Sequence, residues 1–190
     1  MTKAKIGILI SGRGSNMASL VEASKALDSP YEVVLVASNV PDAPGLDFAK
    51  ANGIPTWAHS HVGMKRTEFD ELVDAALREA GAEYVALAGY MRLLSPGFVQ
   101  KWAGRMINIH PSLLPAYKGL DTHQRVLDAA EAKHGCTVHI VTEALDDGEI
   151  VAQAEVPVLP GDNAETLAAR VLVEEHKLYP AALAKLVRGR

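Results

Sequence analysis

The sequence predicts an α/β protein with a doubly wound, mostly parallel sheet, helices on both of its faces and an antiparallel hairpin addition. In the first half, short β-branched runs alternate with segments of helical periodicity, which is typical of parallel sheets covered by helices. In the second half, two strand-like runs flank Asp146-Asp147-Gly148, a turn-forming cluster that predicts an antiparallel pair. The 190 residues contain no repeat, low-complexity tract or linker, so we expect a single domain over residues 1–190.

The first half is expected to contain four strands, at 6–10, 31–37, 84–88 and 106–109. Between them we expect helices at 17–27, at 45–52, from about 67 to 80, and from Pro96 onward. Gly53 and Gly81 are predicted to end the second and third helices, because glycine is the usual residue just past a helix end. Thr67 is a plausible N-cap, and Ser95 followed by Pro96 is typical of a helix start.

In the second half, strands are expected at 136–141 and 150–156. Asp162 with Glu165 is interpreted as a capping box, so a helix should start there and run to about Tyr179. Pro180 is then expected to break or kink this helix, because proline lacks the N–H that the helix needs.

Composition excludes several classes of protein. Hydrophobic residues make up 48% and charged residues 22%, as in ordinary globular proteins, and the net charge of −4 argues against a nucleic-acid partner. The only cysteine, Cys136, excludes an internal disulfide and fits a reducing compartment. The first apolar run ends at Ile10, too short to span a membrane, and no cleavage site follows. We expect a cytoplasmic protein without a membrane partner, either a monomer or a homodimer.

A glycine-rich turn at 11–16, Ser-Gly-Arg-Gly-Ser-Asn, connects the first strand to the first helix. Backbone N–H groups and the helix dipole favour anions at such a place. The dinucleotide fingerprint fails because Met17 replaces its third glycine, and the second strand ends at Asn39 without the acidic residue that would hold a ribose. The turn therefore predicts a site for one phosphate monoester; the alternative is a tight connection that binds no ligand.

Asn108 and His110 lie two residues apart at the end of a predicted strand, so they should face the same side. Pro111 cannot continue a central strand, which places both at the carboxyl edge of the sheet, where α/β proteins bind ligands. An amide can donate to a developing oxyanion and an imidazole can move a proton, a combination suited to acyl transfer. The alternative is an asparagine that caps a bend and a buried histidine satisfied by backbone.

The longer pattern Asn-x-His-Pro-Ser-Leu-Leu-Pro at 108–115, with Leu-Asp-x-Gly at 145–148, resembles the formyltransferase family that uses 10-formyltetrahydrofolate. The segments 11–16, 87–96 and 134–139 match the same family in order. The resemblance is strongest to the members that formylate glycinamide ribonucleotide in purine biosynthesis, and it implies a formyltransferase-like fold. Asp147 is a departure, because glycine is frequent at this place in the family.

The resemblance implies that Asn108, His110 and Asp146 form the catalytic set. A carboxylate near His110 would also favour the imidazolium, although an Asp before a glycine-containing turn is more often structural. By resemblance, the first half, about 1–100, binds phosphate and the second, about 101–190, holds the folate and catalytic groups. The residues implied for the phosphoribosyl group are Gly14, Ser15, Asn16 and Glu175. Those implied for the folate are Arg66, Met91, Arg92, Leu93, Leu94, Asn108, Thr142 and Asp146.

Four rival interpretations remain. Formyltetrahydrofolate hydrolase and methionyl-tRNA formyltransferase share the catalytic set, but each is expected to need a further domain, and the tRNA enzyme a basic surface. A non-catalytic nucleotide-binding module would bind phosphate ligands without depending on His110. A dehydrogenase is disfavoured by Met17 and Asn39. His59 and His61 lie in a loop without a helical carboxylate partner, so no metal is expected.

Overall fold

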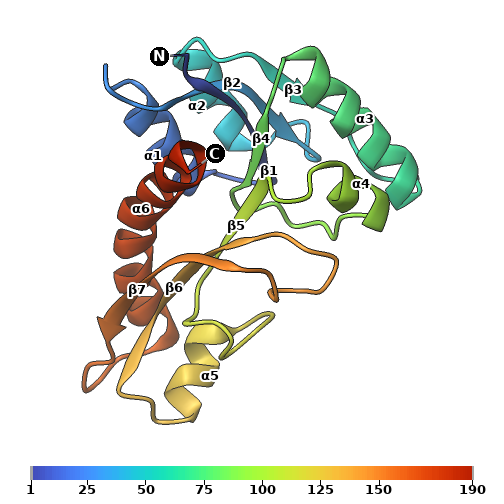
Figure 1. The fold of residues 1–190 in the computed structure, drawn as a ribbon. Coiled ribbons are helices and arrows are strands. Elements are labelled where there is room, and N and C mark those ends of the chain that lie inside the picture. Colours follow the sequence, from blue (N-terminus) through green and yellow to red (C-terminus); the bar gives the residue numbers. More distant parts are fainter. Residues whose placement is uncertain (1, 190) are drawn as a thin grey trace.

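The computed structural model describes residues 2–189 and is built on one seven-stranded sheet, with the order β3-β2-β1-β4-β5-β6-β7 (Figure 1). The strands are β1 (Ala4–Ile10), β2 (Tyr31–Ser38), β3 (Thr56–Ala58), β4 (Tyr84–Leu87), β5 (Met106–His110), β6 (Lys133–Ile140) and β7 (Ile150–Pro157). The first five strands pair in parallel, whereas β6 is antiparallel to β5 and β7 to β6. The predicted sheet with its antiparallel hairpin is confirmed.

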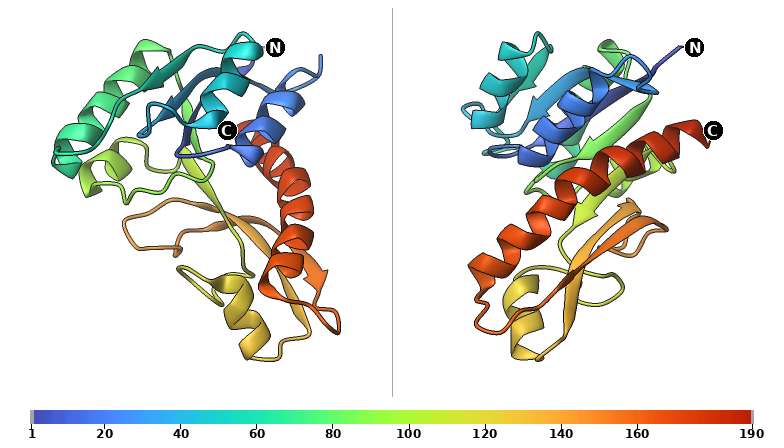
Figure 2. Two further views of the ribbon diagram at one scale, coloured as in Figure 1. Left: turned by 180° about the vertical axis from the view of Figure 1, so that it is seen from behind. Right: turned by 90° about the vertical axis from the view of Figure 1, so that its left-hand side faces the viewer.

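Helices cover both faces of the sheet, as expected (Figures 1 and 2). The helices are α1 (Ser15–Ser24), α2 (Pro44–Ala51), α3 (Arg66–Glu79), α4 (Pro96–Lys101), α5 (Thr122–Asp128) and α6 (Ala164–Arg188). Buried side chains of α1, α2, α5 and α6 pack into one apolar core, and those of α3 and α4 into a second core across the sheet. The sheet therefore separates two cores, and a strand residue belongs to one or the other according to its side.

Strand β5 shows this division and determines which side of the sheet Asn108 and His110 face. Ile107 and Ile109 pack into the core under α6, whereas Met106 belongs to the core under α3 and α4. Because side chains alternate along a strand, Asn108 and His110 face the α3–α4 side together. β5 ends at His110, so both residues lie near the carboxyl ends of β1 and β4, on the edge where open α/β sheets bind ligands.

Both of the N-terminal caps predicted for the longest helices are wrong, by one or two residues. α3 begins at Arg66, before the expected cap Thr67, because the Glu68 carboxylate reaches back to accept the N–H of Lys65 at 3.3 Å. α6 is capped by Asn163, whose side chain accepts the N–H of Thr166 at 2.8 Å, so the capping box predicted for Asp162 and Glu165 is shifted by one position.

The last helix does not end before Pro180 as predicted: α6 continues through Pro180 to Arg188. A proline inside a helix costs about 3 kcal/mol, because it removes one backbone hydrogen bond and crowds the preceding turn. The residues beyond it offset this cost, since Leu183 is fully buried and Val187 nearly so. Burying each such side chain contributes roughly 1.5–3 kcal/mol. Core packing therefore outweighs the local preference of proline.

Two short elements were not predicted, the strand β3 and the helix α5. β3 lies at the sheet edge beside β2 and has only three residues, too few to show a strand pattern in the sequence. α5 follows Asp121, which has a left-handed backbone conformation (φ 54°) and no side-chain cap. None of the helices within residues 2–189 is long and apolar enough to cross a lipid bilayer.

Candidate active site

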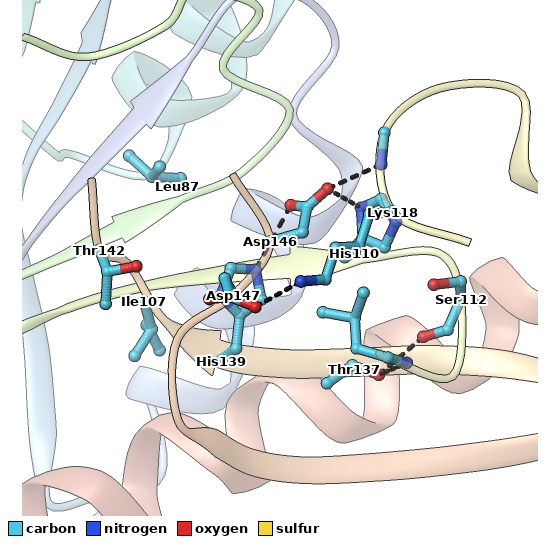
Figure 3. A network of polar contacts seen from close by, with 12 residues as sticks. Leu87, Ile107, His110, Ser112, Lys118, Thr137, His139, Thr142, Asp146 and Asp147 are labelled. Atoms are coloured by element: carbon cyan, nitrogen blue, oxygen red, sulfur yellow. Dashed lines mark hydrogen bonds and ion pairs between the residues drawn. The ribbon is translucent and has the colours of Figure 1, made fainter. Parts of the chain in front are cut away.

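Two connections that are far apart in the sequence meet at the end of β5. One is the segment that follows His110, and the other is the turn between β6 and β7 that contains Asp146 (Figure 3). His110 Nδ1 lies 3.5 Å from Asp146 Oδ2, and both side chains are buried. The same carboxylate oxygen accepts the backbone N–H of Gly119 at 2.9 Å. The structure therefore brings together His110 and Asp146, which the sequence singles out in separate motifs.

The hydrogen bonding of His110 identifies which of its ring nitrogens can exchange a proton. Nε2 lies 2.9 Å from the carbonyl oxygen of Tyr117. A carbonyl can only accept, so Nε2 carries a hydrogen and donates it. In the neutral ring, Nδ1 is then the unprotonated nitrogen, and it is the one that faces Asp146. Protonation at Nδ1 places the new N–H beside the carboxylate, an arrangement that suits a proton shuttle.

Asp146 is held in place by its backbone as well as by its contacts. Its φ of 51° is in the left-handed region, which asparagine and aspartate tolerate better than most residues. The next residue, Asp147, turns outward to form an ion pair with Lys118. This pair is the main reason why the pKa of Asp147 lies below its usual value. The charge that departs from the family pattern is thus compensated locally by Lys118.

Asn108 is half-buried, two residues before His110 on the same side of β5. It pairs across the strands with His139 of β6, whose Nε2 lies 3.8 Å from Asp146 Oδ1. His139 is itself buried, and burial lowers its pKa against the smaller opposing effects of the Ile140 carbonyl and the Asp146 carboxylate. His139 is therefore neutral. It lies beside Asn108 and Asp146, and together with His110 these residues form one cluster at the end of β5.

The glycine-rich turn lies beside this cluster, at the end of β1. It lines a cavity of about 290 Å³. The cavity is lined by Ser11, Gly12, Arg13, Gly14, Ser15, Asn16, Ala88, Gly89 and Met91. Gly14 directly precedes α1 and has a φ of 66°, which glycine adopts without strain. The first N–H groups of α1 have no partner within the helix, and the residues that carry them, Ser15 and Asn16, line this cavity. A helix start lined by hydroxyl and amide groups is suited to a phosphate.

Asn39 explains structurally why this cavity differs from a dinucleotide site. Its side chain accepts the Ser11 hydroxyl at 2.6 Å and contacts His61 Nδ1 at 3.1 Å. Ser11 in turn accepts the N–H of Met91 at 2.8 Å. The residue at the place of a ribose-binding acid is therefore part of a network that holds the turn against residues 89–91.

Glu175 reaches the same region from α6. It is buried, and its Oε1 accepts from Asn16 Nδ2 at 3.1 Å. Burial raises the pKa of Glu175, and the hydrogen bond from Asn16 only partly opposes this effect. The other amide atom, Asn16 Oδ1, is buried without a partner among residues 2–189. The pair therefore offers a carboxylate and a free acceptor, which suit hydroxyl or amine groups of a ligand.

The residues implied for the folate are spread over three segments around the cluster. Met91 and Leu93 are large apolar side chains with 77% and 60% of their surface exposed, an arrangement that invites an apolar ligand face. Arg92 stacks over the Phe69 ring at 5.1 Å, and Leu94 packs against the core under α3 and α4. Arg66 is exposed at the start of α3, and Thr142 is exposed in the β6–β7 connection. Within residues 2–189, neither Arg66 nor Thr142 nor residues 91–94 form a hydrogen bond or ion pair with His110 or Asp146.

The sequence did not indicate that residues 117–119 contact both His110 and Asp146, because they act through backbone groups. The Ser112 hydroxyl is used within the same segment, where it donates to the Ala116 carbonyl at 2.7 Å. Its own carbonyl accepts from Thr137 at 2.7 Å, which ties the segment to β6 (Figure 3). Within residues 2–189, no three His, Cys, Asp or Glu side chains are grouped as a metal site would require.

Comparison with known proteins agrees with this geometry. The family described as formyl transferase matches residues 4–183. Among solved structures, phosphoribosylglycinamide formyltransferase from Brucella melitensis is 50% identical with a TM-score of 0.94, covering 100% of this chain and 98% of that one. Among curated proteins, phosphoribosylglycinamide formyltransferase of Escherichia coli (strain K12) is 42% identical over 97% of this chain and 88% of that protein.

Some relatives are much longer. The trifunctional purine biosynthetic protein adenosine-3 of Bos taurus is 47% identical over 98% of this chain, which spans only 19% of that protein. The chain thus spans 14–19% of the trifunctional relatives and most of the length of the bacterial ones. The match over residues 4–183 and the shared fold lead to one conclusion: this chain belongs to the formyl transferase family.

Proposed function

We propose that this chain transfers the formyl group of 10-formyltetrahydrofolate to the amine of glycinamide ribonucleotide, a step of purine biosynthesis. The observation that carries the proposal is the contact between His110 and Asp146, 3.5 Å apart at the edge of the sheet that also holds the glycine-rich cavity. Relatives named phosphoribosylglycinamide formyltransferase support the same acceptor and the same transferred group.

The acceptor site extends from the glycine-rich turn to His110. The turn follows β1 and His110 ends β5, and only β4 separates these strands in the sheet. Two strand spacings correspond to about 10 Å, a span suited to a phosphoribose with a short amine-bearing arm. In this placement the phosphate binds Gly14 and Ser15 at the start of α1. The buried pair Asn16 and Glu175 meets the ribose or the amine side of the ligand.

The donor lies on the other side of the cluster. Met91 and Leu93 expose apolar surface beside the cavity, and the β6–β7 connection contributes Thr142 and Asp146. A pteridine ring is flat and apolar on its faces and carries polar groups on its rim. It therefore packs on the exposed side chains while backbone groups of residues 91–94 meet its rim. In this proposal Arg66 pairs with a carboxylate of the glutamate tail.

The reaction needs no covalent enzyme intermediate. The acceptor amine attacks the formyl carbon, a new C–N bond forms, and the carbonyl oxygen becomes an oxyanion. Asn108 and the protonated Nδ1 of His110 donate to this oxyanion, and Asp146 stabilises the imidazolium. The attacking nitrogen then loses a proton, the bond from the formyl carbon to the folate nitrogen breaks, and that nitrogen takes up a proton. Holding both reactants beside each other supplies much of the acceleration.

The experiment that tests the function follows formation of tetrahydrofolate from 10-formyltetrahydrofolate, with glycinamide ribonucleotide present or omitted. We expect turnover only with the amine and formylated nucleotide in equal amount. Asn108→Ala should lower kcat by about a hundred- to a thousandfold, the usual effect of losing one oxyanion donor.

The same assay separates the rival functions. Equal turnover with and without the amine would identify a hydrolase instead. Binding of glycinamide ribonucleotide without turnover in either condition would identify a non-catalytic module, for which His110→Ala leaves binding unchanged. A dephosphorylated acceptor is the matched control for the phosphate site, and its KM should rise by at least tenfold while kcat changes little.

A further inference from the structure

Two residues of the segment after the Asn-x-His motif, Tyr117 and Gly119, contact His110 and Asp146 through their backbones. The Tyr117 carbonyl accepts from Nε2 of His110 at 2.9 Å, and the Gly119 N–H donates to Oδ2 of Asp146 at 2.9 Å. These are backbone groups, so their position depends on the conformation of the segment 117–119. Whatever fixes this segment also fixes the orientation of both side chains.

The segment does not adopt this conformation by local preference. Tyr117 has a φ of 55°, in the left-handed region that residues with a bulky side chain rarely occupy, and Asp121 has a φ of 54° in the same region, which aspartate tolerates better. Such residues persist only where surrounding contacts over-determine them. An external restraint is therefore needed to hold residues 117–121 in place.

Arg125 supplies that restraint from α5. Its Nη1 donates to the carbonyl of Lys118 at 2.7 Å and to that of Leu120 at 3.1 Å. Its guanidinium also lies over the Tyr117 ring, 5.3 Å from the ring centre. One side chain thus contacts residues 117, 118 and 120, on both sides of the groups that bind His110 and Asp146. A planar guanidinium can stack on the ring while one of its nitrogens donates to both carbonyls, whereas a lysine ammonium lacks the planar group that stacks.

The helix that carries Arg125 is itself fixed. Val126 is buried in the core under α6, and the Thr122 hydroxyl donates to the Pro111 carbonyl at 2.6 Å. Arg125 lies between these two anchors, on the exposed side of α5. It therefore connects a rigid element to the loop without being part of the core, and replacing it should leave the fold intact.

We infer that Arg125 is a positioning residue of the formyl transfer reaction, acting through the backbone of residues 117–119 on His110 and Asp146. The inference rests on the proposed function and names a residue outside the motifs. Without Arg125, the loop samples other conformations, and the carbonyl that fixes the His110 tautomer and the N–H that binds Asp146 are displaced. Because misplacement by about 1 Å can cost roughly a hundredfold in rate, kcat should fall by about ten- to a hundredfold in Arg125→Met.

The matched control is Arg105, which makes the same kinds of contact at the other end of β5. It donates to the carbonyls of Glu83 at 3.1 Å and Lys101 at 2.9 Å, and it stacks on Trp102 at 4.9 Å. We expect Arg105→Met to leave kcat within about twofold. Arg125→Met should lower kcat, leave the KM of both substrates within about threefold, and change the shape of the pH–rate profile. Arg125→Lys should restore only part of kcat.

A second readout separates this inference from the proposed function. Nitrogen-15 NMR of labelled histidine reports the tautomer of His110 without any turnover. The parent should show the proton on Nε2, and Arg125→Met should show a mixture of tautomers or a shifted titration, while Arg105→Met matches the parent. An unchanged His110 spectrum in Arg125→Met, or an equal loss of kcat in both variants, would overturn the inference. If the parent binds both substrates but does not turn over, the proposed function fails, and the NMR result alone decides the role of Arg125.

Discussion

Asp146 Oδ2 lies 3.5 Å from His110 Nδ1 and at the same time accepts the N–H of Gly119 at 2.9 Å. The carboxylate is therefore oriented by a short contact to the backbone and meets the imidazole at a longer distance. Contacts of this kind are often long in free enzymes and tighten when substrates bind. Asp146 is thus positioned by the loop and remains available to stabilise a positive charge on His110.

Asp146→Asn should lower kcat by about a hundredfold or more. The amide keeps the size of the carboxylate and can still accept from Gly119, but it no longer stabilises the imidazolium. Steady-state assays with both substrates measure the effect. The control is Asp147→Asn, which removes the neighbouring carboxylate that faces Lys118. Equal losses in the two variants would contradict a special role for Asp146.

Asp147 and Lys118 form an exposed ion pair that spans the two connections around the site. Because Lys118 lowers the pKa of Asp147 and compensates its charge, removing either partner alone leaves one charge unbalanced near His110. Lys118→Met leaves the Asp147 charge uncompensated beside Asp146, and a nearby negative charge favours the imidazolium form of His110. The pH–rate profile should therefore move to higher pH in Lys118→Met, to lower pH in Asp147→Gly, and return in the double variant. A shift to higher pH in Asp147→Gly would disprove this explanation.

The sheet and the shared side of Asn108 and His110 could be predicted from the sequence because they depend on short-range patterns. β-branched runs identify most strands, and the two-residue period places Asn108 and His110 on one side. Pro180 shows the opposite case, because its local preference is overridden by the burial of Leu183. Such an outcome depends on which side chains meet in the core, which no local pattern states.

The path of the loop after Pro115 could not be predicted from the sequence either. Tyr117 and Gly119 contact the site through backbone groups, and Arg125 acts through carbonyl oxygens, so residue type alone carries little signal for any of them. The contact of Glu175 with Asn16 joins residues at opposite ends of the chain, and only the family resemblance pointed to that region. Sequence patterns thus identified the reacting side chains, and the structure is needed to identify what orients them.

Glu175 should make the protein less stable as the pH rises. Burial raises its pKa above 4.5, so between 4.5 and the folded-state pKa the folded protein binds more protons than the unfolded chain. The stability contributed by the protonated form is present below about pH 4.5 and is lost as the pH rises through the folded-state pKa. Glu175→Gln removes this dependence, and its amide can pair with both atoms of the Asn16 side chain. Thermal unfolding between pH 4.5 and 8 should show Glu175→Gln gaining stability relative to the parent as the pH increases.

The acceptor assay checks a second consequence of the same substitution. Glu175→Gln should raise the KM for glycinamide ribonucleotide and leave the KM for 10-formyltetrahydrofolate unchanged. The control is Glu174→Gln on the neighbouring, more exposed position of α6. A constant stability difference between Glu175→Gln and the parent across this pH range would contradict a raised pKa for Glu175.

A pair of histidines beneath the loop predicts sensitivity to acid. His123 Nδ1 lies 3.0 Å from His134 Nε2, so one ring donates and the other, which must be neutral, accepts, and the two rings cannot both be protonated. Burial, with smaller effects of His123 and His110, lowers the pKa of His134 from 6.5 to about 4. Between these values the unfolded chain binds more protons than the folded protein, so stability is lost as the pH falls from about 6.5 to about 4. At roughly 1.4 kcal/mol per pKa unit, the loss is about 3 kcal/mol at most.

The variant His134→Gln tests this assignment, because glutamine can bond to His123 but does not titrate. The parent should lose unfolding free energy between pH 7 and pH 4.5, measured by urea denaturation, and His134→Gln should lose distinctly less over the same range. His59→Gln replaces an exposed histidine and should retain the slope of the parent. If His134→Gln shows the same slope as the parent, the lowered pKa of His134 in the folded protein is not the source of the acid sensitivity.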